Sequence, residues 1–306
     1  MSIALNRTGT SICALIISLT LMSADIAFSA GPDTPTRPPI PDRPDSGSEL
    51  PENGSLIEND PGTIGSDLDN SHSDAHVRTT DLWERIRNGF AMAELDSAEV
   101  RYNEDFYASR PKYLGRIIER SKPYLFHIVQ EVARRGMPAE IALLPIVESA
   151  FNPTAFSNRN AAGIWQLIPS TGTTYGLKQN WWYDGRRDIV GATRAALDYL
   201  QNLYGMFGDW ELALASYNWG EGAVGRALEK NRKKGLSTDF RNMTLPPETR
   251  NYIPRLIAIK NIISNPAAFG IELESLPNQP YFEQVSAEHH IDVRLAAWLA
   301  DISVDE

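Results

Sequence analysis

The chain has 306 residues, 42% of them hydrophobic, and a formal net charge of −10, so it can bury one large core or two small ones. Its only cysteine is Cys13, which excludes a disulfide framework, a thiolate catalyst and a cysteine metal site from the rest of the chain. No basic stripe with interleaved aromatic residues occurs, and we therefore expect no nucleic-acid partner.

Residues 1–30 are typical of a secretory signal peptide. Arg7 precedes an apolar run from Ile12 to Met22, and the sequence AFSA at 27–30 offers a cleavage site with small residues. The run is shorter than the ~20 residues that a membrane span needs. Cys13 precedes this run, whereas a lipid-attachment cysteine should follow it. We expect export to the periplasm or cell envelope without membrane attachment; an uncleaved N-terminal anchor is the alternative.

Residues 31–80 are rich in Pro, Asp, Ser and Gly and contain no aromatic residue. This segment holds ten acidic residues against three arginines, so seven of the ten excess negative charges of the chain lie here. Such a segment cannot bury enough apolar surface to offset the entropy lost on folding. We predict a disordered tether that spaces the folded part from whatever holds the N-terminus.

From Asp81 onward the pattern becomes helical. Asp188 and Asp209 are expected to cap two helices, and Pro247 to begin another. Apolar residues with the i, i+3, i+4, i+7 spacing of a helix face also occur, namely Leu125, Ile128, Val129 and Val132. No stretch alternates as a strand would, and no internal repeat occurs. We predict one all-α domain over residues 81–270, followed by a C-terminal extension at 271–306.

Glu148 lies in the sequence LPIVESAFNP (144–153), among apolar neighbours that rarely surround a solvated carboxylate. Pro145 should distort the helix one turn before this acid. An acid held against apolar walls has its charged form disfavoured, so its pKa rises and it can serve as a general acid. The alternative is a surface glutamate at the end of a helix.

Five of the seven tryptophans fall between 165 and 219, and Trp181 and Trp182 lie with Tyr183 in a long irregular stretch at 152–187. A loop of that length inside a compact domain is usually functional. Because an indole ring has a flat apolar face and a polar edge, we expect these residues and Glu148 to line a carbohydrate groove. For Trp210, which begins a helix, we favour core filling.

The sequence contains no convincing metal-binding or cofactor-binding motif. The histidines have no ligand-spaced neighbours, and the sequence GEGAVG (220–225) follows a helix rather than the strand that a dinucleotide site requires. We therefore expect neither a metal ion nor a cofactor.

Four motifs occur in the order and spacing of the soluble-type lytic murein transglycosylases, which belong to glycoside hydrolase family 23. They are ES (148–149), GIWQ (163–166), SYN (216–218) and the tyrosine of ETRNYIP, Tyr252. Residues 81 to about 278 most resemble the membrane-bound D-type branch. The resemblance implies a goose-lysozyme-like helical domain that cleaves the MurNAc-β-1,4-GlcNAc bond of peptidoglycan and leaves 1,6-anhydromuramyl ends. Peptidoglycan glycan strands would be its partner, with cell-wall enzymes as possible further ones.

The resemblance also implies a role for each matching residue. Glu148 would be the single acid/base, and Tyr252 would face its carboxyl group. Ser157 would help to orient the sugar and the acid. The substrate-binding set that the resemblance implies comprises Ser157, Trp165, Gln166, Tyr217, Asn218 and Tyr252.

The chain departs from the family in two motifs. The commonest second motif ends Leu-Met-Gln, whereas this chain has Ile164, Trp165 and Gln166, although the D-type branch also uses tryptophan there. In the third motif Ser216 replaces the usual alanine. D-type relatives often carry a lipidated N-terminus and C-terminal peptidoglycan-binding repeats, and this sequence shows neither. Because it stops at Glu306 within an expected helix, we expect either a truncated chain or a protein without wall anchoring.

Two other functions stay open. One is a lysozyme- or chitinase-type hydrolase on the same fold, which would need a second acid. The candidates for that acid are Asp184, Asp188, Asp209, Glu211 and Glu221. The other is a non-catalytic glycan-binding or scaffold protein, which the intact Glu148 disfavours.

Overall fold

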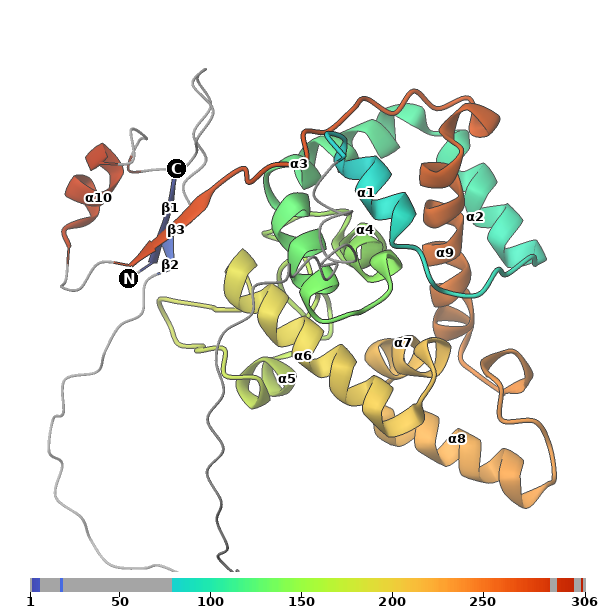
Figure 1. Cartoon of the computed structure of the whole chain (residues 1–306). Coiled ribbons are helices and arrows are strands. Elements are labelled where there is room, and N and C mark those ends of the chain that lie inside the picture. The colour runs from blue at the N-terminus through green and yellow to red at the C-terminus, as the bar shows by residue number, and fades with distance from the viewer. Residues whose placement is uncertain (1, 6–16, 19–78, 287–290, 300–303, 305–306) are drawn as a thin grey trace, which may run out of the picture. The chain divides into compact units, whose positions relative to one another are not determined.

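The computed structural model describes residues 2–5, 17–18, 79–286, 291–299 and 304 (Figure 1). Most of the predicted signal peptide and nearly all of the predicted tether lie outside the described residues, and both assignments stay predictions. Within the described part of the chain, no helix combines the length and the hydropathy that a membrane crossing requires.

Between residues 81 and 270 the chain is helical, which confirms the predicted all-α class. Strand-like pairing in this range is limited to isolated bridges. The α-helices are α1 (Leu82–Asn88), α2 (Ala98–Ala108), α3 (Pro111–Arg134), α4 (Leu144–Ser149), α5 (Pro169–Thr174), α6 (Ile189–Phe207), α7 (Trp210–Trp219), α8 (Glu221–Lys233) and α9 (Pro247–Ser264). Short 3₁₀ helices occur at η2 (Ala139–Leu143), η3 (Phe240–Asn242) and η4 (Pro266–Phe269).

The ends of the helices follow local sequence signals. Asp188 Oδ1 accepts a hydrogen bond from Gly191 N at 2.9 Å, and Asp209 Oδ1 accepts one from Leu212 N at 2.8 Å, so both predicted caps are confirmed. Pro247 is the first residue of α9, where its missing N–H costs no intrahelical hydrogen bond. The predicted apolar face of α3 is buried along its length.

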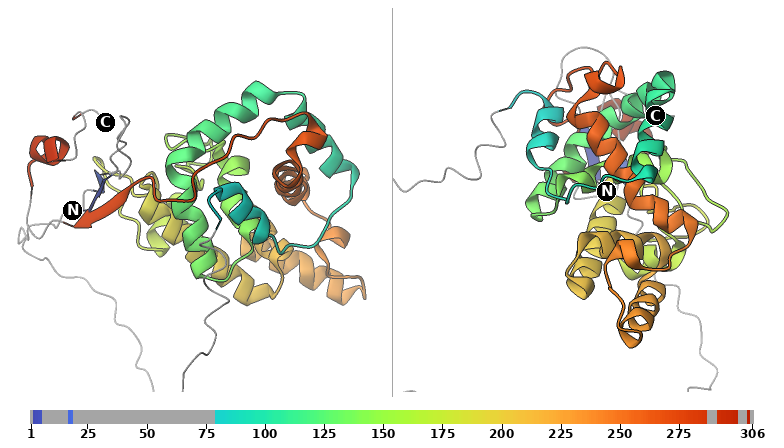
Figure 2. Two further views of the ribbon diagram at one scale, coloured as in Figure 1. Left: turned by 45° about the horizontal axis from the view of Figure 1, so that its top comes forward. Right: turned by 90° about the vertical axis from the view of Figure 1, so that its right-hand side faces the viewer.

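Helix α9 lies at the centre of the helical domain. It packs against α2, α7, η2 and α4, and the left view of Figure 2 looks along its axis, with the helices of residues 98–134 arching around it. Its buried residues lie on most of its sides, from Thr249 to Ile263. A helix surrounded in this way is held by packing on several faces, so its side chains have fixed positions.

Three short strands lie outside the range 81–270. β1 (Ser2–Leu5) pairs antiparallel with both β2 (Ile17–Ser18) and β3 (Glu283–Ser286). No strand was predicted at these positions, because segments of two to four residues are too short to show alternation. β1 and β2 fall within the predicted signal peptide.

The predicted C-terminal extension begins against α1. Leu82 N donates to Leu276 O at 2.7 Å, and Asn278 N donates to Thr80 O at 3.0 Å. Further along, the extension contains β3 and α10 (Val293–Leu299).

Candidate active site

Glu148 lies in the last turn of α4, directly before a sharp change of chain direction. Pro145 stands in the first turn of this six-residue helix, where its missing N–H costs no intrahelical hydrogen bond. The irregularity expected before the acid occurs instead as the change from the 3₁₀ helix η2 to α4 between Leu143 and Leu144. Ala150 and Phe151 both adopt left-handed backbone conformations, with φ of 53° and 55°. Their N–H groups donate to Ile146 O and Pro145 O, which closes the helix end. Because Phe151 is fully buried, this end of α4 is fixed against the core.

The hydroxyl of Tyr252 donates a hydrogen bond to Oε1 of Glu148. Tyr252 comes from the central helix α9 and is 3% exposed, whereas Glu148 keeps partial exposure. The resemblance implied that a tyrosine faces the acid, and the geometry places Tyr252 there.

Burial raises the pKa of Glu148 to about 7. The hydrogen bond from Tyr252 acts in the opposite direction because it favours the ionised carboxylate. Among the weaker effects, the charge of Glu248 raises this pKa and that of Arg255 lowers it. Near neutral pH both protonation states are therefore populated, and one carboxyl group can donate a proton in one step and accept one in another.

Two hydrogen bonds fasten the loop at 163–166 beside the acid. The hydroxyl of Tyr217 donates to Trp165 O at 2.7 Å, and Ser149 Oγ donates to Ile164 O at 2.9 Å. Burial raises the pKa of Tyr217, and the nearby charge of Glu148 raises it further. The structure thus brings the predicted residues Glu148, Tyr217 and Tyr252 into one electrostatic group.

The predicted substrate-binding role of the Trp165 side chain is wrong. Its side chain is 0% exposed and its indole N–H donates to Thr193 Oγ1 at 3.0 Å, within the core. The ring therefore has no free face for a sugar. Spacing in a motif does not report whether a side chain points inward, and a large ring gains more free energy from burial than most residues. Only its backbone carbonyl, which accepts from Tyr217, takes part in the site.

Three other predicted residues are held by hydrogen bonds to their surroundings. Gln166 has a left-handed backbone, φ 47°, and its amide donates to Gly163 O at 2.9 Å. Ser157 Oγ accepts from Ala161 N at 3.0 Å, which closes its own turn. Asn218 Oδ1 accepts from Thr249 Oγ1 at 2.8 Å. These contacts shape the loops, and a direct role toward a ligand stays a prediction.

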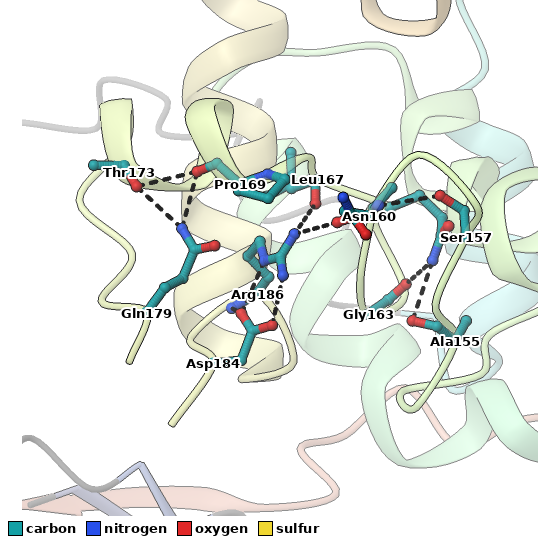
Figure 3. A network of polar contacts seen from close by, with 12 residues as sticks. Ala155, Ser157, Asn160, Gly163, Leu167, Pro169, Thr173, Gln179, Asp184 and Arg186 are labelled. Atoms are coloured by element: carbon teal, nitrogen blue, oxygen red, sulfur yellow. Dashed lines mark hydrogen bonds and ion pairs between the residues drawn. The ribbon is translucent and has the colours of Figure 1, made fainter. Parts of the chain in front are cut away.

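Arg186, which sequence reasoning missed, is the central residue of the polar network in Figure 3. Its side chain is buried and donates to Asp184 Oδ1 and Oδ2 at 2.9 and 2.7 Å, to Leu167 O at 3.1 Å and to Asn160 O at 2.5 Å. Gly163 lies against its backbone: an added Cβ would be 2.0 Å from Arg186 O. The doubled arginine at 186–187 before the cap Asp188 was the only sequence signal available.

A row of three partly exposed tyrosines leads away from the acid. The ring centroids of Tyr217 and Tyr199 are 5.5 Å apart, and those of Tyr199 and Tyr175 are 5.4 Å apart. The Tyr199 hydroxyl donates to Glu221 Oε2 at 2.8 Å, and Asn202 Nδ2 donates to the Tyr175 hydroxyl at 3.0 Å. Aromatic faces with polar groups along their edges are suited to sugar rings.

The candidate second acids all have partners. Asp188 and Asp209 cap helices, and Glu221 accepts from Tyr199. Asp184 pairs with Arg186, and Glu211 lies 3.5 Å from Arg241. In the described residues, no group of three or more His, Cys, Asp or Glu is placed to hold a metal ion.

Comparison with known proteins adds an independent observation. Residues 127–240 match the family model described as the transglycosylase SLT domain. The resemblance to lytic murein transglycosylases that the four motifs predicted is confirmed. The match to the SLT domain ends before α9, so Tyr252 lies beyond it.

The relatives of this chain include membrane-bound lytic murein transglycosylase D of Escherichia coli (strain K12), which is 42% identical over 227 residues, 74% of this chain and 50% of that protein. The chain spans about half the length of this relative. A protein of Alteromonas sp. (strain M-1), named for tributyltin chloride resistance, is 45% identical over 126 residues, 41% of this chain and 61% of its own. Lytic transglycosylase Slt of Pseudomonas aeruginosa superposes with a TM-score of 0.40 at 20% identity, over 65% of this chain and 34% of that one.

Proposed function

We propose that this protein is a peptidoglycan lytic transglycosylase that cleaves the MurNAc-β-1,4-GlcNAc bond and leaves 1,6-anhydromuramyl ends. The single observation that carries the proposal is the placement of Glu148, a half-buried residue whose carboxyl accepts a hydrogen bond from the buried Tyr252. Burial raises the pKa of this carboxyl to about 7, which suits a group that acts as acid and base in turn. The SLT domain and the name of the E. coli relative support the substrate class.

The proposed reaction needs one carboxyl group. Protonated Glu148 donates its proton to the glycosidic oxygen as the bond between that oxygen and C1 of MurNAc breaks, and GlcNAc leaves with a free hydroxyl. The N-acetyl carbonyl of MurNAc assists at C1. The C6 hydroxyl of the same sugar then attacks C1 and gives its proton to the Glu148 carboxylate. No water is consumed, and Glu148 returns to its starting state.

Tyr252 would hold the carboxyl of Glu148 in place through both steps. Its hydrogen bond favours the ionised form that exists between the two proton transfers, since a donor aimed at developing charge stabilises it without reorganising. Tyr217 and Ser149 would keep the 163–166 loop at a fixed distance from the acid. The tyrosine row would carry sugars next to the cleaved bond.

The predicted domain organisation completes the proposal. Residues 1–30 would direct export, 31–80 would act as a tether, and the helical domain would work on glycan strands in the cell envelope. Interaction with other cell-wall enzymes is part of the same prediction.

The test is digestion of purified peptidoglycan sacculi in water labelled with heavy oxygen, followed by mass spectrometry of the released muropeptides. A transglycosylase gives products that are lighter than reducing ends by one water and carry no label. Labelled reducing ends would favour the hydrolase, and binding without release would favour the non-catalytic glycan-binding protein.

A further inference from the structure

Trp181 and Trp182 stand out on the surface of the helical domain. They are 89% and 85% exposed, more than any other large hydrophobic side chain in the described residues. Tryptophan is highly buried on average, because covering its large ring releases much ordered water. Two adjacent exposed indoles therefore indicate a surface that a ligand covers.

Hydrogen bonds within the turn order the backbone that carries the two rings. Asn180 Oδ1 accepts from Trp182 N and from Tyr183 N, both at 2.8 Å, and Asn180 N donates to Tyr183 O at 2.8 Å. A ligand that binds here does not have to order the backbone, so less of the binding free energy is lost to entropy.

Hydrogen bonds on both sides of this turn hold it to neighbouring segments of the chain (Figure 3). Gln179 Nε2 donates to Pro169 O at 2.9 Å and to Thr173 Oγ1 at 3.1 Å, which fixes the turn to α5. On its other side Asp184 pairs with the buried Arg186, which holds the loop that contains Gln166 through Leu167 O.

Helix α5 is also where the tyrosine row ends. Tyr175 directly follows α5, and the row runs from it through Tyr199 to Tyr217 beside Glu148. The tryptophan turn is therefore fixed to the helix at the far end of an aromatic track that starts at the acid.

We propose that Trp181 and Trp182 form a distal platform for the glycan strand, which stacks on sugar rings several residues away from the bond that is cleaved. This inference rests on the proposed function, since it takes the strand of peptidoglycan as the ligand. The platform makes the protein favour long strands over short fragments, because only a long strand reaches both the acid and the turn.

The composition of the turn favours a sugar over a lipid surface. Residues 178–188 contain no aliphatic side chain, and the rings stand among the polar residues Gln179, Asn180 and Tyr183. Binding to a lipid surface scales with buried apolar area and with basic clusters that meet anionic head groups. A rigid pair of flat rings with amides beside them matches the flat apolar faces and the hydroxyl rims of sugars.

The experiment compares three versions of the full chain, each also carrying Glu148→Gln so that the strands stay intact during binding. The first has no further change, the second has Trp181→Ala with Trp182→Ala, and the third has Trp181→Phe with Trp182→Phe. Co-sedimentation with purified sacculi gives the affinity for long strands. Trp298→Ala, at a site that is 75% exposed in α10, is the matched control.

We expect the double alanine variant to bind sacculi about tenfold more weakly or worse, because each lost aromatic face removes a contact worth about threefold or more and the two losses multiply. The double phenylalanine variant keeps flat rings and should keep most of the affinity, and Trp298→Ala should match the parent. With Glu148 intact, the double alanine variant should release products from a soluble tetrasaccharide muropeptide at the parent rate and lose rate only on sacculi.

Unchanged binding of the double alanine variant to sacculi overturns the platform. So does an equal loss of rate on the tetrasaccharide, since that would indicate a general defect. Loss of binding to phosphatidylglycerol–phosphatidylethanolamine vesicles without loss on sacculi would assign the rings to a lipid surface. If the chain with Glu148 intact releases nothing from sacculi, the proposed function fails. The platform still stands in that case, provided that the double alanine variant binds sacculi more weakly.

Discussion

The hydroxyl of Tyr252 in α9 donates a hydrogen bond to the carboxylate of Glu148 in α4, from 104 positions further along the chain. Two effects on the pKa of Glu148 oppose each other: burial raises it, and the hydrogen bond from Tyr252 lowers it. The central helix α9 therefore supplies one of the groups that set the proton affinity of the acid, although it lies beyond the residues that match the SLT domain.

The first prediction concerns the pH dependence of the rate. Glu148 must be protonated to begin the proposed reaction, so kcat/KM on soluble muropeptides should fall as pH rises through about 7. Tyr252→Phe removes the hydrogen bond that lowers this pKa, and the descending limb should move to higher pH, whatever happens to the maximal rate. Tyr204→Phe, a change on an exposed ring stacked on Trp210, is the control and should leave the limb in place. A limb that stays fixed in Tyr252→Phe would contradict the assignment.

The second prediction concerns stability and activity in Glu148→Gln. Because the folded-state pKa of Glu148 is raised from 4.5 to about 7, its protonated form stabilises the fold fully below pH 4.5, and that contribution is lost as pH rises through about 7. The neutral amide avoids the cost of a buried charge. At pH 8 the free energy of unfolding of Glu148→Gln should therefore exceed that of the parent by about 2 kcal/mol at most, and the variant should unfold at a higher temperature. At pH 4 the two proteins should differ little.

The same variant should release no muropeptides, since glutamine cannot supply a proton. Thermal scans at the two pH values and mass spectrometry of the digest check both parts. The prediction is contradicted if Glu148→Gln gains no stability over the parent between pH 4 and pH 8. The carboxylate of Glu148 would then be well solvated in the fold.

Much of the helical domain could be predicted from the sequence because its signals are local. Asp188 and Asp209 cap their helices through bonds to residues three positions away, and the apolar spacing in α3 directly reflects its buried face. Glu148 could be singled out for a similar reason: its immediate neighbours are apolar, and burial is the largest cause of its pKa shift.

The rest of the candidate site depends on contacts between distant segments. Trp165 was expected in the groove but is buried against Thr193, 28 positions away, and no local pattern distinguishes the two placements. Arg186 was missed because its partners, Leu167 O and Asn160 O, are backbone atoms, which any residue type supplies. The exposure of Trp181 and Trp182 likewise follows from where the chain turns.

The third prediction concerns Gly163. A Cβ there would meet Arg186 O at 2.0 Å, and the φ of +76° is disfavoured for other residues. Gly163→Ala should therefore push the loop at 163–166 away from Arg186 and destabilise the domain by more than about 2 kcal/mol. Gly205→Ala is the matched control: it lies in α6 with nothing within 4 Å, and alanine should stabilise that helix by up to about 1 kcal/mol. Chemical denaturation of both variants measures the difference, and equal effects would show that the close approach is not rigid.

The last prediction separates the transglycosylase from the hydrolase. If a second carboxylate attacked the sugar or activated a water, it should be one of the five acids near the motifs: Asp184, Asp188, Asp209, Glu211 or Glu221. Each has a structural role instead. Burial would raise the pKa of Asp184, but the hydrogen bonds from Arg186 outweigh it and hold the pKa below its ordinary value, so this acid stays paired and ionised. Burial raises the pKa of Glu211, and the nearby Arg241 opposes that rise.

Single amide variants, Asn for Asp and Gln for Glu, should therefore keep unlabelled anhydromuramyl ends as the main product from sacculi. Asp188→Asn and Asp209→Asn keep a capping oxygen, so their stability losses should stay within ~1 kcal/mol. Asp184→Asn should lose the most stability, because it leaves the buried charge of Arg186 without its ion-pair partner. The measurement counts reducing and anhydro ends separately, with circular dichroism to confirm folding. A loss of about a thousandfold in rate at one of the five positions in a folded variant would identify a second catalytic acid, because general acid–base groups contribute on that scale.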